Sequence, residues 1–239
     1  MASSSSTSPF ASADVERFNA IFARVAAQLA RPAVEFSALM ADPIFWGWGA
    51  PRGDGHSVLA LPGLGGGDGY LRPLRGWLRR IGYRPVDSGL EVNPGWSEDL
   101  LDELTGLVEQ EFRRSGAKLT IIGHSLGGVY GYAIAAHQPQ MIRHVITLAS
   151  PLALVRRSLP SAVAISAFYS RSDSIVRHPA AVASDRHARK IEVDSSHIGM
   201  ATNPDVYRRL GRLLQQGGSE DKQRANSLRY TNLTRNNTA

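Results

Sequence analysis

From Ser57 onward, short apolar runs alternate with segments in which apolar residues recur at helical spacing. The apolar runs predict strands at 57–62, 118–123, 143–150, 162–170 and 190–194, with a weaker strand at 83–88. The helical spacing predicts helices over 69–81, 97–114, 126–136 and 203–216. Strands that alternate with helices form a mostly parallel sheet covered on both faces, which is the α/β class. We therefore expect the chemistry at the carboxyl ends of the strands.

The chain divides into a core and three flanking segments. Residues 1–13 are serine-rich and predict a disordered tail, and residues 14–54 predict a helical and aromatic N-terminal extension. The α/β core is expected over 55–216, followed by a polar tail over 217–239. Residues 14–30 form an amphipathic pattern, which is compatible with packing on the domain or with surface contact to a membrane or partner.

Composition narrows the functional classes. The chain has no cysteine, so no disulfide is expected, and no apolar stretch is long enough to span a membrane. The N-terminal residues lack the apolar core of a secretory signal, so a cytoplasmic location is the default expectation. The net charge is +6, but arginine pairs such as Arg79-Arg80 and Arg208-Arg209 fall on or beside predicted helices, which indicates solvated faces. We find no nucleic-acid reader motif, and expect no nucleic-acid partner.

One serine stands among glycines between a predicted strand and a predicted helix. Residues 123–127 read Gly-His-Ser-Leu-Gly, which matches the G-x-S-x-G pattern of a nucleophile elbow. At such an elbow Gly123 and Gly127 are small because the strand and helix backbones crowd one another. Ser125 is therefore the predicted nucleophile. A glycine-rich strand-to-helix turn with a structural serine is the alternative.

A serine hydroxyl needs a base and an orienting carboxylate, expected in the chain order serine, acid, histidine. Asp173 follows the predicted strand at 162–170, and His197 follows the strand at 190–194. Both lie at the edge of the sheet that carries Ser125, so we expect the three side chains to converge. Asp194 and Asp185 are weaker candidates for the acid. His124, beside the nucleophile, is expected to point elsewhere.

The glycine-rich loop "LPGLGGGDGY" after the first core strand is placed to form an oxyanion hole. The expected donors are the backbone N–H groups of Leu64 and Leu126. The loop does not match G-x-G-x-x-G, and no Walker lysine follows it, so a dinucleotide or phosphate role is disfavoured. We also expect Trp46, Trp48 or Trp96 to border the pocket, because all three lie in predicted loops.

The segments "LALPGLGGGDGYLRPLRGWLRRIGYRPVDSGL", "LTIIGHSLGG", "ITLASPL", "FYSRSDSIV" and "DSSHIGMATNP" resemble bacterial α/β-hydrolase-fold proteins related to lipases and esterases. The resemblance covers about residues 55 to 215. It implies a triad of Ser125, Asp173 and His197, oxyanion donors at Leu64 and Leu126, and ester hydrolysis through an acyl-enzyme without metal or organic cofactor.

Two features depart from that family's usual pattern. Only a short segment separates the strands at 143–150 and 162–170, which predicts a minimal lid or none and an open site. The usual leading antiparallel strands are also missing. Together the residues favour a serine carboxylic-ester hydrolase acting on small or medium acyl esters, with a small-molecule or lipid ester as substrate. An acyltransferase with the same triad, or a non-catalytic scaffold that binds a partner, stays open, and the sequence does not determine the oligomeric state.

Overall fold

A single parallel sheet forms the centre of the computed structural model, which describes residues 30–155, 158–182 and 187–216. Six strands of the described residues pair in the order β2-β1-β3-β4-β5-β6, and every pairing is parallel. The strands are β1 (Ser57–Leu61), β2 (Arg84–Val86), β3 (Leu119–His124), β4 (Ile142–Leu148), β5 (Ala164–Tyr169) and β6 (Arg189–Glu192). The predicted α/β fold is confirmed, and parallel pairing brings the carboxyl ends of all strands to one edge.

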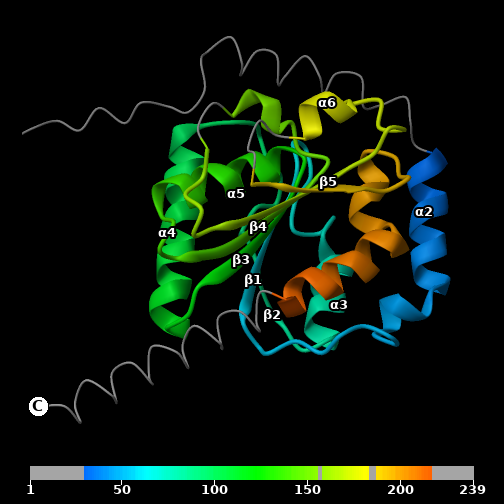
Figure 1. Cartoon of the computed structure of the whole chain (residues 1–239), viewed down its shortest axis with the longest axis horizontal. Coiled ribbons are helices and arrows are strands. Elements are labelled where there is room, and N and C mark those ends of the chain that lie inside the picture. Colours follow the sequence, from blue (N-terminus) through cyan, green and yellow to red (C-terminus); the bar gives the residue numbers. More distant parts are fainter. Residues whose placement is uncertain (1–29, 156–157, 183–186, 217–239) are drawn as a thin grey trace, which may run out of the picture.

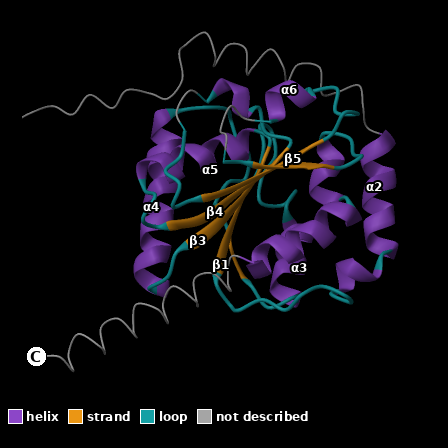
Figure 2. Cartoon of the chain, in the orientation of Figure 1, coloured by secondary structure: helices purple, strands orange, loops and turns teal. Residues whose placement is uncertain are grey.

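Helices cover both faces of this sheet (Figures 1 and 2). One face carries α4 (Glu98–Ser115) and α5 (Leu126–His137), and the other carries α2 (Ala30–Ala41), α3 (Arg72–Arg80) and the helix over residues 204–216. Alternate residues of β1 point to opposite faces of the sheet. Leu59 and Leu61 are buried in the core on the first face, and Val58 and Ala60 are buried in the core on the second. The shorter elements are η2 (Pro43–Trp46), η3 (Leu152–Leu154), α6 (His178–Ala181) and η4 (Ile198–Thr202).

Local signals explain where the helices begin and end. Ser97 caps α4, because its side chain accepts a hydrogen bond from the N–H of Leu100 at 3.1 Å. Gly116 ends the same helix in the left-handed conformation, with φ of 63°. The helix expected over 69–81 begins only at Arg72, since Gly67 to Tyr70 form a hydrogen-bonded turn first.

The N-terminal extension contributes a helix that packs on the end of the sheet bearing η4. The predicted amphipathic helix over 14–30 lies almost wholly outside the described residues. Directly after it, α2 turns Glu35 and Leu39 inward and contacts η4, while Val34 is exposed. The extension thus lies beside the loop that follows β6, which carries His197.

The connection between β4 and β5 lies against α5. Leu152, Val155 and Leu159 are buried in the same cluster as the side chains of α5, and the N–H of Leu159 donates to the Tyr132 hydroxyl at 3.1 Å. The described residues of this connection therefore belong to the core on the α5 face of the sheet. Among the described helices, none combines the length and the apolar character that crossing a bilayer requires.

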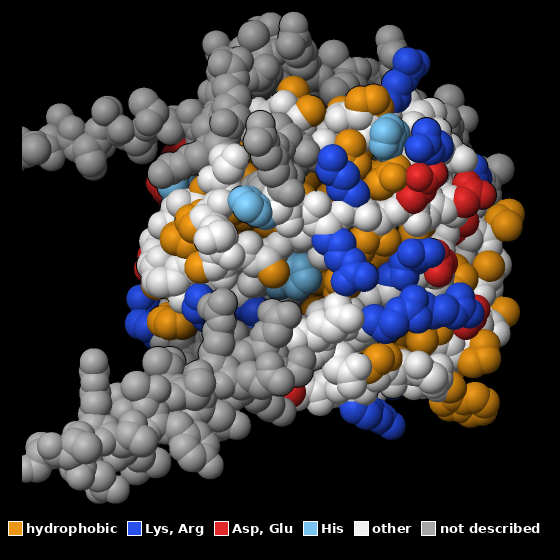
Figure 3. Space-filling view, viewed as in Figure 1, with side chains coloured by type: hydrophobic (Ala, Val, Ile, Leu, Met, Phe, Trp, Pro, Cys, Tyr) orange, Lys and Arg blue, Asp and Glu red, His pale blue; other side chains and the backbone are white. Residues whose placement is uncertain are grey.

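The charged surface agrees with the prediction of solvated faces. Figure 3 shows Lys and Arg side chains with Asp and Glu side chains between them on one face of the molecule. Two arginines of the helix over 204–216 are paired: Arg209 contacts Asp205 at 2.8 Å, and Arg208 contacts Asp42 at 2.5 Å. Such mixed surface charges favour solubility and do not mark a binding site by themselves.

Candidate active site

Ser125 lies at the turn between β3 and α5, in a backbone conformation that residues other than glycine rarely adopt. Its φ is 51° and its ψ is −120°. A backbone of this kind costs on the order of 1–3 kcal/mol and persists only where the surroundings enforce it. Here the N–H of Ser125 donates to the carbonyl of Leu148 on β4 at 2.8 Å, and its own carbonyl accepts from Gly128 at 3.0 Å. The sheet therefore holds the strained turn and presents the hydroxyl at its carboxyl edge.

Glycine is needed on both sides of Ser125 because the backbones nearly touch. A Cβ atom at Gly123 would overlap the backbone of Gly128, and one at Gly127 would overlap the carbonyl oxygen of Leu61. This close approach of β1, β3 and α5 is the physical reason for the Gly-x-Ser-x-Gly spacing.

The structure brings the predicted nucleophile, base and acid together in one hydrogen-bonded chain. Nδ1 of His197 lies 2.8 Å from Oδ2 of Asp173, and its Nε2 lies 3.0 Å from Oγ of Ser125. An ionised carboxylate only accepts, so Nδ1 carries the proton and Nε2 is left to accept from the hydroxyl. All three side chains are buried.

Asp173 is held in place by its own loop. Its Oδ1 accepts from the backbone N–H groups of Ile175 and Val176 at 2.8 and 2.9 Å, which leaves Oδ2 for the imidazole. Of the competing acids, Asp194 has an 80% exposed side chain that faces Arg31, and Asp185 lies outside the described residues. Asp173 is thus the carboxylate that meets His197.

A cavity of about 310 Å³ opens beside Ser125. It is lined by Gly63, Leu64, Gly65, Gly66, Tyr70, His124, Ser125, His197 and Ile198. In the glycine-rich loop the N–H of Gly65 donates to the Asn93 carbonyl and that of Gly66 to the Gly63 carbonyl. Within the described residues the N–H groups of Leu64 and Leu126 have no hydrogen-bond acceptor, so these two donors are available to a ligand.

Asn93 is a residue of the site that the sequence did not reveal. Its backbone exchanges hydrogen bonds with the glycine-rich loop, accepting from Gly65 at 2.9 Å and donating to Gly66 at 2.7 Å. Its side-chain Nδ2 donates to the carbonyl of Pro62 at 2.9 Å. These contacts fix the loop that carries Leu64. They join segments about thirty residues apart, and no local pattern signals such a contact.

His124 does not point away from the site, contrary to the prediction. Its side chain lines the cavity, and its Nε2 lies 2.9 Å from the backbone carbonyl of His197. A carbonyl only accepts, so Nε2 must be protonated. Burial, with a smaller contribution from the neighbouring His197, lowers the pKa of His124 to about 3, which keeps the ring neutral at physiological pH.

The predicted tryptophans do not line the cavity, so that expectation is wrong. The Trp46 indole donates to the carbonyl of Met40, and Trp48 lies 75% exposed near Arg208. Trp96 stacks on Tyr130 of α5, with ring centroids 4.6 Å apart. A place in a loop predicts neither which way an indole points nor what it packs against.

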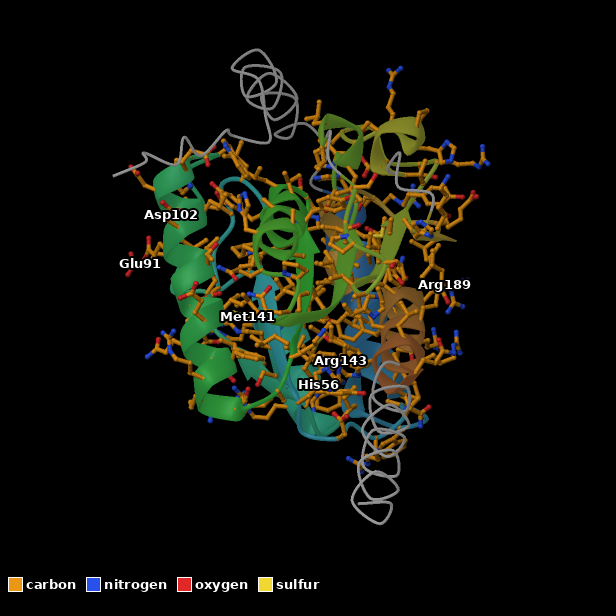
Figure 4. The ribbon with its side chains drawn as sticks, turned by 60° about the vertical axis from the view of Figure 1, so that its left-hand side comes forward. His56, Glu91, Asp102, Met141, Arg143 and Arg189 are labelled. Carbon is orange, nitrogen blue, oxygen red and sulfur yellow. The ribbon has the colours of Figure 1, made fainter. Side chains whose placement is uncertain are left out.

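A second buried polar cluster lies at the amino ends of the strands, opposite the cavity. His56 and Arg143 lie side by side there (Figure 4), and Nδ1 of His56 is 3.0 Å from Nη1 of Arg143. Nδ1 of His56 also contacts Asp54 at 2.6 Å, and its Nε2 contacts the hydroxyl of Thr120 at 3.1 Å. Because a guanidinium only donates, Nδ1 of His56 either accepts from Arg143 or donates to Asp54, and Arg143 also pairs with Asp54 at 3.7 Å. The part of the chain that is described gathers no group of three side chains suited to a metal ion.

Comparison with known proteins identifies the family to which this chain belongs. The model of the family described as "Putative esterase" matches residues 82–238, more than half of the chain. The chain belongs to this esterase family. It is a hydrolase of the α/β-hydrolase superfamily, as the resemblance in its motifs implied. The matched segment includes Ser125, Asp173 and His197 and begins after the glycine-rich loop.

Individual relatives of the esterase are distant. The "Putative carbamate hydrolase RutD" of Pantoea ananatis is 28% identical over 108 residues, which is 42% of this chain and only 38% of that protein's length. A structure described as a "putative hydrolase of the alpha/beta superfamily" from Xanthomonas campestris pv. campestris has 20% identity and a TM-score of 0.51, covering 68% of this chain and 99% of that one. The monoacylglycerol lipase of Paleococcus ferrophilus has 15% identity and a TM-score of 0.52, covering 70% and 96%. The two structures share the fold with the esterase.

Proposed function

We propose that this esterase hydrolyses carboxylic esters through an acyl-enzyme formed on Ser125. The observation that carries the proposal is the hydrogen-bonded chain from Asp173 through His197 to Ser125, which ends in a cavity. An imidazole that accepts from a serine hydroxyl and donates to a buried carboxylate is arranged to remove the hydroxyl proton.

In the proposed reaction, Oγ of Ser125 attacks the ester carbonyl while Nε2 of His197 takes its proton. The backbone N–H groups of Leu64 and Leu126 stabilise the oxyanion, assisted by the amino end of α5, where the helix dipole favours negative charge. His197 returns the proton to the departing alkoxide, and Asp173 stabilises the imidazolium throughout. Water then releases the acid by the same steps.

The reaction is tested by covalent trapping. A fluorophosphonate should add to the full-length chain once, as read by intact mass, and the adduct should map to Ser125. The Ser125→Ala variant should stay unlabelled, whereas Ser115→Ala, which removes an exposed hydroxyl on α4, should label like the original chain. Labelling of all three proteins at another residue, or of none, would overturn the proposal.

The cavity favours small or medium acyl groups. Its volume is about 310 Å³, and Leu64, Tyr70 and Ile198 contribute its larger side chains. A long acyl chain would have to leave the cavity and lose the burial that favours binding by about 0.8 kcal/mol per CH₂. We expect kcat/KM on p-nitrophenyl esters to be highest between butyrate and octanoate and lower for palmitate. A maximum at palmitate that rises further at a lipid interface would contradict this preference.

A further inference from the structure

We propose that Glu35, on α2, is a positioning residue that holds His197 in register with Ser125. The inference rests on the proposed function of that histidine as the base. Glu35 stands more than 150 residues before His197, outside the segment that matches the esterase family. Glu35 acts on His197 through Ser195 and Ser196, the two residues of the loop directly before this histidine.

Glu35 is a buried carboxylate, and both of its oxygens accept hydrogen bonds from that loop. Its Oε1 accepts from Oγ of Ser195 at 2.9 Å and from the backbone N–H of Ser196 at 2.7 Å, and its Oε2 accepts from Oγ of Ser196. A buried charge is costly unless hydrogen bonds compensate it, so three donors from two successive residues form a strong anchor. A Cβ atom at Gly199 would overlap the same carboxylate, which shows how closely α2 approaches the loop.

The backbone around His197 is thereby held at three successive residues. Glu35 binds the N–H of Ser196, Nε2 of His124 donates to the carbonyl of His197 at 2.9 Å, and the Tyr70 hydroxyl donates to the carbonyl of Ile198 at 2.5 Å. Burial, and to a smaller degree the Glu35 carboxylate, raises the pKa of Tyr70, so the phenol keeps its donor proton.

These three anchors come from different elements: α2, the end of β3 and the turn before α3. Of these three, Glu35 holds the loop on the side of β6, where Oγ of Ser170 also accepts from the N–H of Ser195 at 3.2 Å. Releasing it would let the loop shift relative to Ser125, and a displacement near 1 Å in an active site costs about 10²-fold in rate. The side chain of Glu35 does not line the cavity, so ground-state substrate binding should be little affected.

Glu111 provides a matched control. It is buried to the same degree, with 8% of its surface exposed against 9% for Glu35, and it accepts from Oγ of Ser57 at 2.6 Å. Ser57 begins β1, so this carboxylate lies at the amino ends of the strands, away from the cavity. Glu35→Gln and Glu111→Gln both place an amide NH₂ among hydrogen-bond donors. Glu111→Gln also weakens ion pairs with Arg84 and Arg114, so it should destabilise the fold at least as much as Glu35→Gln. Only Glu35→Gln should affect the base.

The experiment measures kcat, KM and the fluorophosphonate labelling rate of the full-length chain and both variants. For Glu35→Gln we expect kcat and the labelling rate to fall together, by roughly 10- to 100-fold, with KM within about twofold. For Glu111→Gln we expect a lower melting temperature with kcat within about twofold. Equal kcat in the original chain and folded Glu35→Gln would overturn the inference, as would equal losses in the two glutamine variants.

Two further outcomes separate this inference from the proposed function. If the original chain shows neither turnover nor labelling, the proposed function fails. If Glu35→Gln does not fold, Ser196→Ala tests the same anchor, because it removes one hydroxyl donor and keeps the backbone donor. We then expect a smaller loss in kcat, of about three- to tenfold, at unchanged KM. Unchanged kcat in Ser196→Ala would overturn the inference in that case.

Discussion

Ser125→Ala should lower kcat on p-nitrophenyl butyrate by roughly 10⁴-fold or more. Removing a member of a catalytic triad lowers the rate on this scale. Without Oγ no acyl-enzyme forms, and His197 can only assist water. The residual rate should reflect the cavity and the free N–H groups of Leu64 and Leu126. The measurement is a steady-state rate on protein purified free of host esterases.

The fold should survive this change. Alanine occupies the strained φ of 51° no worse than serine, and the N–H of residue 125 keeps its bond to Leu148. We therefore expect the melting temperature to change by no more than about 4 °C, which corresponds to about 1 kcal/mol in a domain of this size. A variant that melts normally and still turns over at the original rate would mean that the nucleophile lies elsewhere.

Asp173→Asn should lower kcat by roughly 10³- to 10⁴-fold, because it reverses the tautomer of the base. Oδ1 accepts from the N–H groups of Ile175 and Val176, so the asparagine carbonyl must take that position. Its NH₂ then faces Nδ1 of His197, and Nδ1 must accept instead of donate. The proton moves to Nε2, which can no longer accept from Ser125.

Asp194→Asn is the control for this prediction, because the Asp194 carboxylate lies only three residues before His197 in the chain. Its side chain is 80% exposed, and an exposed ion pair contributes little, so kcat should stay within about fivefold. Comparable losses in the two asparagine variants would contradict the assignment of the acid. Both proteins should be compared by melting temperature, so that a folding defect is not mistaken for a lost base.

Local sequence was enough to place the elbow and the ends of the strands. The apolar runs before Ser125, Asp173 and His197 mark buried parallel strands, and such strands end at one edge of a sheet. Convergence of the three side chains therefore follows from topology, with no knowledge of side-chain contacts. The glycine spacing carried information that is only partly local. Gly123 is crowded by the helix that follows the serine, whereas Gly127 is crowded by Leu61 at the end of β1.

Other features were out of reach because they depend on how distant segments pack. Their place in loops predicts that the tryptophans border the pocket, but a loop's sequence does not determine which way its side chains point. His124 was expected to point away, yet its ring turns to the carbonyl of His197, which is 73 residues later.

The sequence by itself determined the class of sheet, the strained serine turn and the order of the three chemical groups, because these follow from periodicity, glycine and chain order. Only the tertiary structure decided what supports them. Asn93 fixes the loop of Leu64, and Glu35 grips the loop of His197, each through hydrogen bonds to a segment remote in the chain. Such partners are selected when the whole fold closes, since the contact depends on where two segments meet and not on the pattern of either one.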